Sequence, residues 1–485
     1  MPGPAAGLGR RLDVVVPAHD EQSLIGGCLR AVLCDANTID LRIIVVANGC
    51  SDGTTQLVRA IAADLPARDG SRRPAEVVLV ELPAAGKAAA LNAGDRQRRG
   101  DASVLYLDAD TVITPGTLPA LVDALTETRA ARLVAPRPVL VRPTDRLGRD
   151  FAAVWLALPA VSGQVVGAGC YAVNPAGRAR WTEFPELTAD DAYVRSRFTS
   201  AERRVVGSGG FLLVLPRWRE LIAVASRWRR GNAELASLAR HHRGPGRDGD
   251  RLTRTGSASP AAGAGRNLTT VATQPALWPR LPGFLLVNWA GRLRPRQRWA
   301  RAAGLRAMAP DQPPSGRPCT VDVLVIRRPR VALDRCLASL RSDWARLCVT
   351  VVDADTATVN RVADRGEGNY LLLVDGDVEL IPGALDQLLA VAIRFPTAGL
   401  YGGAPAARRP PSERAGPADR PGRARRYDVH PTRSLPTGLL LVERTWWHRL
   451  GGLDGHHRDP EGNLCRRARR SGAAPMRASS AAYRD

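Results

Sequence analysis

The stretch LYLDAD, Leu105–Asp110, decides the fold because an apolar run passes directly into two carboxylates one residue apart. Residues 104–107 are apolar without alternation, which predicts a short parallel strand buried on both faces. Asp108 and Asp110 would then stand at the carboxyl end of that strand, where open α/β sheets bind their ligands. Carboxylate oxygens suit hard cations such as Mg²⁺ and Mn²⁺, and such a cation can hold a diphosphate. The other interpretation is a solvated turn, in which Asp is common.

The flanking sequence alternates apolar strands with helices, which indicates a doubly wound α/β domain. Strands are expected at 12–16, 41–46 and 77–82, and helices at 20–34, 55–65 and 88–98. After the Asp pair, Pro115-Gly116 turns the chain into a helix near 118–125. A single strand is expected at 133–141, and a long basic helix at 217–239.

Composition describes a globular protein with an excess of basic residues. The chain has 485 residues, 45% hydrophobic and 24% charged, which allows two or three domains with real cores. The net charge of +22 is almost all arginine, and Lys87 is the only lysine. This fits the compositional bias of a GC-rich genome, so part of the charge need carry no function. The remainder favours anionic partners such as nucleotide phosphates or acidic lipid headgroups.

Cysteine spacing and hydropathy predict a cytoplasmic protein. None of the eight cysteines forms a CxxC pair, so neither a zinc site nor a thioredoxin-like motif is indicated, and buried thiols suit a reducing compartment. Residues 1–11 lack the apolar core of a signal peptide, and no run approaches the roughly 20 apolar residues that span a bilayer. The sequence also allows peripheral contact of this cytoplasmic protein with the inner face of the cell membrane.

A second copy of the decisive stretch begins the last third of the chain. LLLVDGD at 371–377 repeats it, and Asp375 stands seven positions before Pro382, as Asp108 stands seven before Pro115. The second copy is shorter, because Asp13 to Asp108 spans 95 positions and Asp322 to Asp375 spans 53. This register predicts an internal duplication with a shortened second copy.

The expected organisation is a first domain at 1–242, a linker at 243–318 and a second domain at 319–485. The linker contains a basic segment, 277–308, that mixes Leu, Phe and Trp with Arg. It could be an amphipathic helix lying on an acidic membrane, or a helix packed between the two domains. Prolines interrupt any long helix there. Residues 404–426 form a further low-complexity insertion.

Five motifs between Leu12 and Leu238 resemble, in order, those of the inverting glycosyltransferases of family 2, whose fold is called GT-A. They are VPAHDE at 16–21, NGCSDGT at 48–54, GKAAALN at 86–92, DAD at 108–110 and DD at 190–191. The second copy resembles the same family through DGD at 375–377, GLLLVER at 438–444 and GGLD at 451–454. Each motif alone is weak, whereas five in order are specific.

The resemblance implies a role for each motif in transferring a sugar from a nucleotide sugar. Asp191, with Asp190 beside it, would be the general base for the acceptor hydroxyl. Asp108 and Asp110 would hold Mg²⁺ or Mn²⁺ against the diphosphate. The residues implied to bind the nucleotide-sugar donor are Pro17, His19, Glu21, Asn48, Asp52, Lys87, Asp108, Arg229 and Arg230.

Some matches depart from the family pattern. Asn48 stands where the family usually has Asp, which leaves the identity of the nucleotide base open. The family's Gln-x-x-Arg-Trp order is absent around Arg229 and Arg230, so an exposed basic helix face is the alternative for these two. Lys87 could likewise be a solvated residue at a helix start. In the second copy, the family's base motif would fall on EGNL at 461–464, with Gly462 at the catalytic position. That copy is expected to be degenerate, with a structural, acceptor-binding or regulatory role.

The predicted function is metal-dependent inverting glycosyl transfer to a carbohydrate or lipid-linked acceptor, in the synthesis of a cell-surface polysaccharide or glycolipid. The alternative is a non-catalytic basic scaffold built from glycosyltransferase-like domains. A sugar-nucleotide pyrophosphorylase is disfavoured, because the sequence after the first strand, 17–20, is not a Gly-rich loop. Binding to nucleic acid is disfavoured, because only 5% of the residues are aromatic and the sequence contains no recognisable RNA- or DNA-binding motif.

Overall fold

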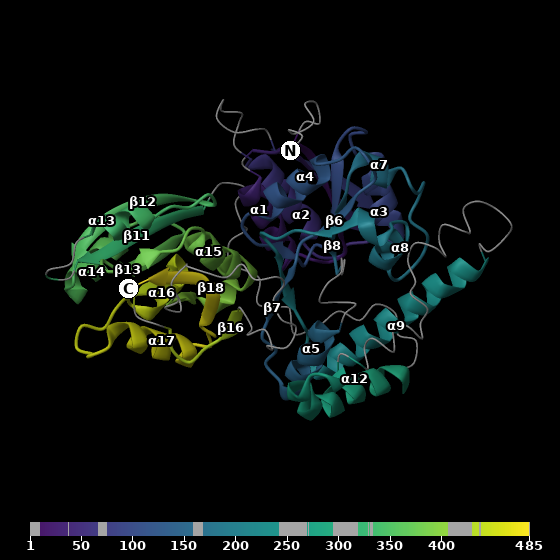
Figure 1. The fold of residues 1–485 in the computed structure, drawn as a ribbon. Helices are drawn as coiled ribbons and strands as arrows, with labels where there is room; N and C mark the ends of the chain where they lie inside the picture. The colour runs from purple at the N-terminus through teal and green to yellow at the C-terminus, as the bar shows by residue number, and fades with distance from the viewer. Residues whose placement is uncertain are drawn as a thin grey trace.

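The computed structural model places two sheet-containing halves side by side, with a group of helices below the first half (Figure 1). It describes residues 10–36, 38–65, 75–158, 168–241, 269, 271–293, 319–327, 329, 333–405, 429–435 and 438–484. Most of the predicted linker, 243–318, and most of the predicted insertion, 404–426, lie outside the described residues.

The first half is built on a seven-stranded sheet in the order β3-β2-β1-β4-β8-β6-β9. The first four strands are mutually parallel, and β8 pairs antiparallel with both β4 and β6. The strands are β1 (Arg11–Ala18), β2 (Asp40–Asn48), β3 (Ala75–Leu82), β4 (Ser103–Leu107), β6 (Leu133–Ala135), β8 (Cys170–Val173) and β9 (Arg203–Val205). The predicted mixed α/β fold is therefore confirmed.

Helices cover both faces of this sheet, which explains why β4 is buried along its whole length. Val14 and Val16 of β1 pack in one core with α1, α2 and α4, while Val15 between them packs in a second core with α3 and Tyr193 of α8. The helices are α1 (Ile25–Asp35), α2 (Thr54–Ala63), α3 (Lys87–Arg96), α4 (Thr117–Thr126), α7 (Pro175–Arg178) and α8 (Asp190–Ser196).

The second half contains a sheet in the order β12-β11-β13-β17-β15-β18-β16. Its strands are β11 (Cys319–Arg327), β12 (Ala345–Asp353), β13 (Tyr370–Asp375), β15 (Leu400–Pro405), β16 (Val429–Pro431), β17 (Leu439–Glu443) and β18 (Met476–Arg484), and β14 (Glu379–Leu380) pairs with β18. Its helices are α13 (Asp334–Ser339), α14 (Thr356–Arg365), α15 (Ala384–Arg394), α16 (Arg444–Leu450) and α17 (Pro460–Arg470).

The two halves share strands and a core. Val429 of β16 pairs with Val141 of β7 (Pro138–Val141), which carries the sheet on to β10 (Phe211–Val214) and β5 (Val112–Ile113) of the first half. Residues of α1 and α15 belong to the same buried cluster. The predicted single strand at 133–141 is wrong, because β6 and β7 pair in different sheets on either side of residues 136–137.

Strand order is the same in the two halves. The series β2-β1-β4-β8-β6-β9 and β12-β11-β13-β17-β15-β18 have the same sequence of parallel and antiparallel pairings. Gly116 before α4 and Gly383 before α15 have nearly the same left-handed backbone, with φ of 78° and 80°. In the described residues, no strand continues the second sheet beyond β12, where the first sheet has β3.

A group of three helices projects below the first half: α5 (Arg146–Ala157), α9 (Trp218–His241) and α12 (Leu281–Leu293), preceded by the 3₁₀ helix η2 (Pro275–Arg280) (Figure 1). Phe284 of α12 stacks on Phe151 of α5 at 5.2 Å, and Trp155 of α5 stacks on Trp228 of α9 at 5.4 Å. The basic segment of the predicted linker thus includes a short helix that packs on the first half. No helix among the described residues is both long and apolar enough to cross a bilayer.

Candidate active site

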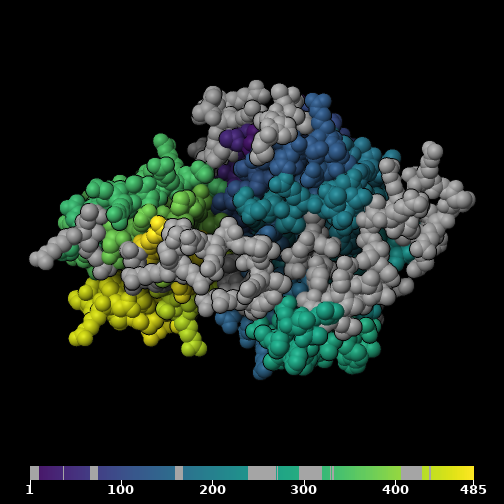
Figure 2. Space-filling model, viewed as in Figure 1, coloured from purple at the N-terminus to yellow at the C-terminus, as the bar shows by residue number. Residues whose placement is uncertain are grey.

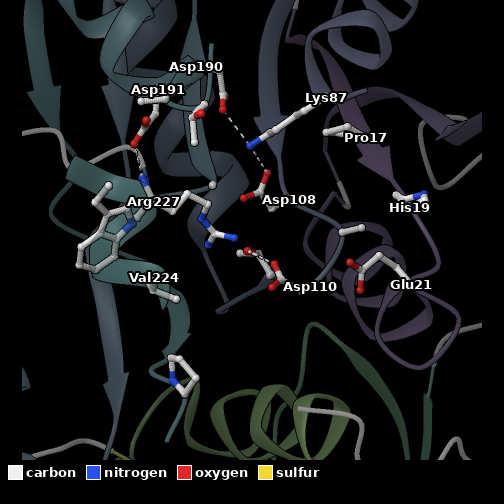
Figure 3. A pocket seen from close by; sticks show the side chains of 18 of the residues that line it. Pro17, His19, Glu21, Lys87, Asp108, Asp110, Asp190, Asp191, Val224 and Arg227 are labelled. Carbon is white, nitrogen blue, oxygen red and sulfur yellow. Dashed lines mark hydrogen bonds and ion pairs between the residues drawn. The ribbon is translucent and has the colours of Figure 1, made fainter. Parts of the chain in front are cut away.

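A cavity of about 670 Å³ opens at the carboxyl ends of β1 and β4. Its walls come from the loops after these strands, from residues 168–169 and 186–191, and from β10 and α9. The two predicted carboxylate pairs lie on different sides of it, with Lys87 between them (Figure 3). Motifs that are more than 80 residues apart in the sequence therefore meet in one place.

Lys87 joins the two carboxylate pairs. Its Nζ lies 2.9 Å from Asp108 Oδ1 and 2.8 Å from Asp190 Oδ1. Burial opposes the charge of this ammonium, but the two carboxylates more than offset it, so the pKa of Lys87 is raised above its usual value. Lys87 begins α3, and the strand-to-helix turn at Gly86 aims it into the cavity. The geometry is not that of a solvated residue at a helix start.

Asp108 is held in position by the backbone opposite. Its N–H donates to Gly169 O at 2.8 Å, and the Cys28 thiol donates to its carbonyl oxygen at 3.7 Å. Gly169 has φ of +80°, and a Cβ there would lie 2.4 Å from Asp108 Oδ2. Only glycine combines this backbone conformation with room for the carboxylate.

Asp108 and Asp110 both offer carboxylate oxygens to the cavity. Asp110 opens onto the cavity with protein around it, and this desolvation, followed by the charge of Asp108, raises the pKa of Asp110. Two nearby carboxylates that disfavour each other's charge provide the hard oxygen ligands that Mg²⁺ or Mn²⁺ prefers. Arg227 of α9 reaches toward Asp110 from the other side of the cavity (Figure 3) and favours its charged form.

Asp190 and Asp191 begin α8, where the helix dipole favours negative charge. Asp190 Oδ2 accepts a hydrogen bond from Tyr171 OH at 2.9 Å, which fixes its orientation. Asp191 Oδ2 accepts from Ala168 N–H at 3.2 Å, and its Oδ1 accepts from its neighbour Ala192 N–H at 2.7 Å. Desolvation, followed by the charge of Asp190, raises the pKa of Asp191. A raised pKa suits a carboxylate that must accept a proton near neutral pH.

Asn48 ties together the loops that form the end of the cavity near β1 and β2. Its amide donates to Ala18 O at 2.7 Å, and its Oδ1 accepts from Gly86 N–H at 3.0 Å. His19 Nδ1 donates to the Asn48 carbonyl oxygen at 2.7 Å. A carboxylate could not donate to Ala18 O, so the amide at position 48 makes a contact that Asp would lack.

Most of the residues implied to bind the donor do line the cavity, but two do not. Asp52 is not among the lining residues, since its oxygens accept from Gln22 N–H at 3.1 Å and Thr54 N–H at 3.0 Å and organise the start of α2. Arg229 is exposed on α9 and also lies outside the lining. The expected lining residues are Pro17, His19, Glu21, Asn48, Lys87, Asp108, Asp110, Asp190, Asp191 and Arg230.

Two cations of the cavity were not predicted. Arg227 stands three positions before Arg230, the spacing that places both on one face of a helix, so helical periodicity along α9 could have identified it. Arg394 comes from α15 in the second half, and no local sequence pattern connects it to the site.

Comparison with known proteins finds a family match for the part of the chain that carries Lys87, Asp108 and Asp110. Residues 13–158 match the model of the family described as glycosyl transferase family 2. Over 115 residues the chain is 31% identical to undecaprenyl-phosphate 4-deoxy-4-formamido-L-arabinose transferase of Aeromonas hydrophila, covering 23% of this chain. The chain spans only 33% of the length of that relative.

Solved structures to which parts of the chain are similar include the following two. Glucosyl-3-phosphoglycerate synthase of Mycobacterium tuberculosis is 23% identical, with 48% of this chain and 81% of the other covered and a TM-score of 0.34. A mannosyltransferase of Pyrobaculum calidifontis in complex with GDP-Man and Mn²⁺ is 17% identical, with 59% and 87% covered and a TM-score of 0.38. Residues 13–158 are therefore similar to glycosyl transferase family 2, and the structure around them has a mixed α/β fold.

Proposed function

We propose that the chain transfers a sugar from a nucleotide-diphosphate donor to a hydroxyl acceptor, with inversion at the anomeric carbon. The observation that carries this proposal is the arrangement of the two carboxylate pairs in one cavity, bridged by Lys87 at 2.9 Å and 2.8 Å. Asp108 and Asp110 are suited to binding a cation, and Asp191 is suited to accepting a proton. Transfer from a nucleoside diphosphate requires both roles, since the leaving diphosphate must be neutralised and the acceptor hydroxyl deprotonated.

In the proposed reaction, the acceptor hydroxyl loses its proton to Asp191 as its oxygen forms a bond to the anomeric carbon. The bond from that carbon to the diphosphate oxygen breaks at the same time, and its electron pair leaves with the nucleoside diphosphate. A single displacement needs one base and inverts the configuration, whereas retention would need a nucleophilic carboxylate close to the anomeric carbon. Asp190, held by Tyr171, positions Lys87 rather than the acceptor.

Asp108 and Asp110 would hold Mg²⁺ or Mn²⁺, which when bound neutralises charge on the leaving diphosphate. Lys87, Arg227 and Arg230 add protein cations to the cavity lining. The nucleoside would lie at the end of the cavity that is lined by Pro17, His19 and Glu21. Asn48 supports the loop of these residues through its hydrogen bond to Ala18 O.

We further propose that the second half, 319–485, is a shortened copy of the first domain, 1–242, that has lost catalysis. Its strand order and pairing directions support this, and so do details around the repeated Asp. Asp375 N–H donates to Gly438 O at 3.1 Å, and the Cys336 thiol donates to the Asp375 carbonyl oxygen at 3.7 Å. These contacts repeat those of Asp108 with Gly169 and Cys28. Asp459 caps α17 by accepting from Gly462 N–H, the position where a base would be needed.

The acceptor is proposed to be carried on a lipid, with the protein bound peripherally to an acidic membrane. Five large apolar side chains on η2 and α12 are 47% to 64% exposed, and we call them the α12 outer face: Trp278, Leu285, Leu286, Trp289 and Leu293. Residues 275–293 contain Arg280 and Arg292 but no acidic residue. An apolar helix face with Trp and Arg suits an interface with anionic lipid.

The α12 segment forms part of the lower margin of the molecule (Figure 2). It packs on α9, the helix that also supplies Arg227 and Arg230 to the cavity, and we place the lipid-linked acceptor on this side of the molecule. The Aeromonas relative is named for undecaprenyl phosphate, a polyprenyl lipid, which supports an acceptor of this kind.

The reaction is tested by incubating the full chain with UDP-, GDP- and dTDP-sugars, Mn²⁺ and a polyprenyl phosphate, and measuring nucleotide release. The expected result is metal-dependent release with at least one donor. Replacing Asp191 with Asn should lower turnover by roughly 10²-fold or more while leaving donor binding in place. Asp377→Asn in the second half is the matched control and should leave turnover unchanged. If no nucleotide binds and none is released, the proposed function is wrong.

A further inference from the structure

Arg394 brings the second half into the cavity of the first. It is the last residue of α15, it is 5% exposed, and it is the one lining residue of the cavity that comes from the described part of 319–485. A helix in the green of the second half lies beneath Asp110 and Glu21 in the close view (Figure 3). The second half, although proposed to have lost catalysis, therefore contributes a residue to the cavity of the first half.

The guanidinium of Arg394 is in an unusual electrostatic position. Burial lowers its pKa, and the carboxylates of Asp110 and then Glu21 act in the opposite direction. Its Nε–H is buried and has no hydrogen-bond partner among the described residues. An unpaired buried donor is costly, and the charge of this guanidinium would be stabilised by an anion bound in the cavity that Arg394 lines.

The position of Arg394 is fixed by close packing between the halves. A Cβ on Gly27 of α1 would lie 3.1 Å from Ile393 O, the carbonyl next to Arg394, so α15 approaches α1 more closely than most side chains would allow. Trp344 Nε1 donates to Asp35 Oδ1 at 3.3 Å across the same interface. The Arg394 guanidinium also lies 5.2 Å from the Phe395 ring. A side chain held this way is pre-organised for a ligand.

The cavity lining carries more carboxylates than cations, so the positive charge of Arg394 matters for binding an anion there. The lining includes eight carboxylates, from Asp20, Glu21, Asp108, Asp110, Glu186, Asp190, Asp191 and Glu234, but only four permanent cations, from Lys87, Arg227, Arg230 and Arg394. A diphosphate adds further negative charge. Lys87 is already shared by Asp108 and Asp190, which leaves the side near Asp110 and Glu21 dependent on the arginines.

We propose that Arg394 is a donor-binding residue supplied by the second half, and that its guanidinium donates to a phosphate oxygen of the nucleoside diphosphate. This inference rests on the proposed function, because it needs a nucleotide donor in the cavity. It assigns the second half a direct part in the site of the first: it completes the cation set that binds the leaving group. Guanidinium is well suited to this task, because its planar donors match phosphate geometry.

The test measures binding of UDP, GDP and uridine to the full chain with Mn²⁺ by calorimetry, for wild type, Arg394→Met and Arg394→Lys. Arg394→Met should weaken binding of the nucleoside diphosphate roughly 10- to 100-fold, as expected for a lost charged hydrogen bond. Binding of the phosphate-free nucleoside should be unchanged. Arg394→Lys should recover part of the affinity, since it restores the charge without the planar fork.

Arg30→Met is the matched control, because Arg30 lies on α1 in the electrostatic field of Cys319 and Tyr370 of the second half, yet outside the cavity lining. It should change thermal stability without changing nucleotide affinity. If wild type binds and turns over a donor while a folded Arg394→Met binds it equally well, the inference about Arg394 is wrong and the proposed function stands. An equal loss for uridine and UDP would also overturn the assignment to phosphate. If wild type binds no nucleotide, the proposed function itself fails.

Discussion

Lys87 Nζ lies 2.9 Å from Asp108 Oδ1, so the sole lysine of the chain occupies the first carboxylate of the proposed metal pair. A divalent cation bound there would share Asp108 with this ammonium. Lys87→Met should therefore strengthen Mn²⁺ binding roughly tenfold in the absence of nucleotide, because a competing positive charge is removed. Turnover should nevertheless fall, since the diphosphate loses a cation.

Calorimetric titration with Mn²⁺ alone measures the first effect, and nucleotide release measures the second. Lys87→Arg keeps the charge and should leave Mn²⁺ affinity close to that of wild type. Unchanged Mn²⁺ affinity in Lys87→Met would show that the ammonium and the metal do not share Asp108.

Gly169→Ala should remove activity by displacing Asp108. The new Cβ would lie 2.4 Å from Asp108 Oδ2, in addition to the strain of φ at +80°. We expect a loss of turnover of roughly tenfold or more, since small misplacements of reacting groups are costly. Gly116→Ala is the control, because its φ is +78° but a Cβ there would meet nothing within 4 Å. It should lower stability by about 1 kcal/mol from backbone strain alone and keep turnover. Equal activity in the two variants would contradict this explanation.

Glu202→Gln should destabilise the first half in a pH-dependent way. The pKa of Glu202 is lowered to about 2, chiefly by hydrogen bonds from Arg180. Burial opposes this shift, and a hydrogen bond from the Thr199 backbone adds to it. A carboxyl with a depressed pKa in the folded state stabilises the protein above its unfolded pKa, 4.5, and this is lost as pH falls toward 2. With solvent screening at a 27% exposed side chain, we expect a loss of about 1–2 kcal/mol at pH 7.

The free energy of unfolding in urea, measured from pH 7 down to pH 3, checks this prediction. The difference between wild type and Glu202→Gln should shrink as pH falls below about 4.5. Glu127→Gln provides the comparison, since Glu127 pairs with Arg204 at a 46% exposed site and should cost less than about 1 kcal/mol. A difference that stays constant with pH would mean that the charge of Glu202 contributes nothing.

The double substitution Leu285→Ser and Trp289→Ser should release the protein from anionic vesicles. Each side chain belongs to the α12 outer face, and burying one in lipid is worth about 1.5–3 kcal/mol. Co-sedimentation with phosphatidylglycerol vesicles should therefore fall more than roughly tenfold. Val349→Ser, at a 44% exposed site in the second half, should sediment like wild type. Equal binding by the double variant would show that another surface contacts lipid, and no binding by wild type would remove the membrane proposal.

The elements of the first half were predictable because local patterns determine them. The apolar run before Asp108 became a buried strand, and the helix after Pro115-Gly116 begins at Thr117 as expected. The long basic helix also forms, from Trp218 to His241. At 136–137 the pattern failed, because the change from one sheet to another depends on partners elsewhere in the chain. Sequence periodicity does not encode which sheet a strand joins.

Site residues that belong to a sequence motif could be predicted, whereas a residue brought to the site only by tertiary packing could not. Asp108, Asp110, Asp190, Asp191 and Lys87 converge because each ends a strand or begins a helix at the same sheet edge. Asp52 belongs to a motif but turns away to bond Gln22 and Thr54, since its loop needs those hydrogen bonds. Arg394 lies on an otherwise ordinary helix of the second half. Only the packing of α15 against α1 brings it to the cavity, and that packing is a tertiary property.

The pairing of β16 with β7 has a consequence for how the chain could be divided. Because one hydrogen-bonded sheet and one apolar core include both halves, a fragment ending at residue 318 would expose the faces of α1 and β7 that the second half covers. Truncation should therefore give an insoluble product rather than a minimal enzyme. Two separate polypeptides, 1–318 and 319–485, carry complementary surfaces and should reassemble when co-expressed, as a split protein does.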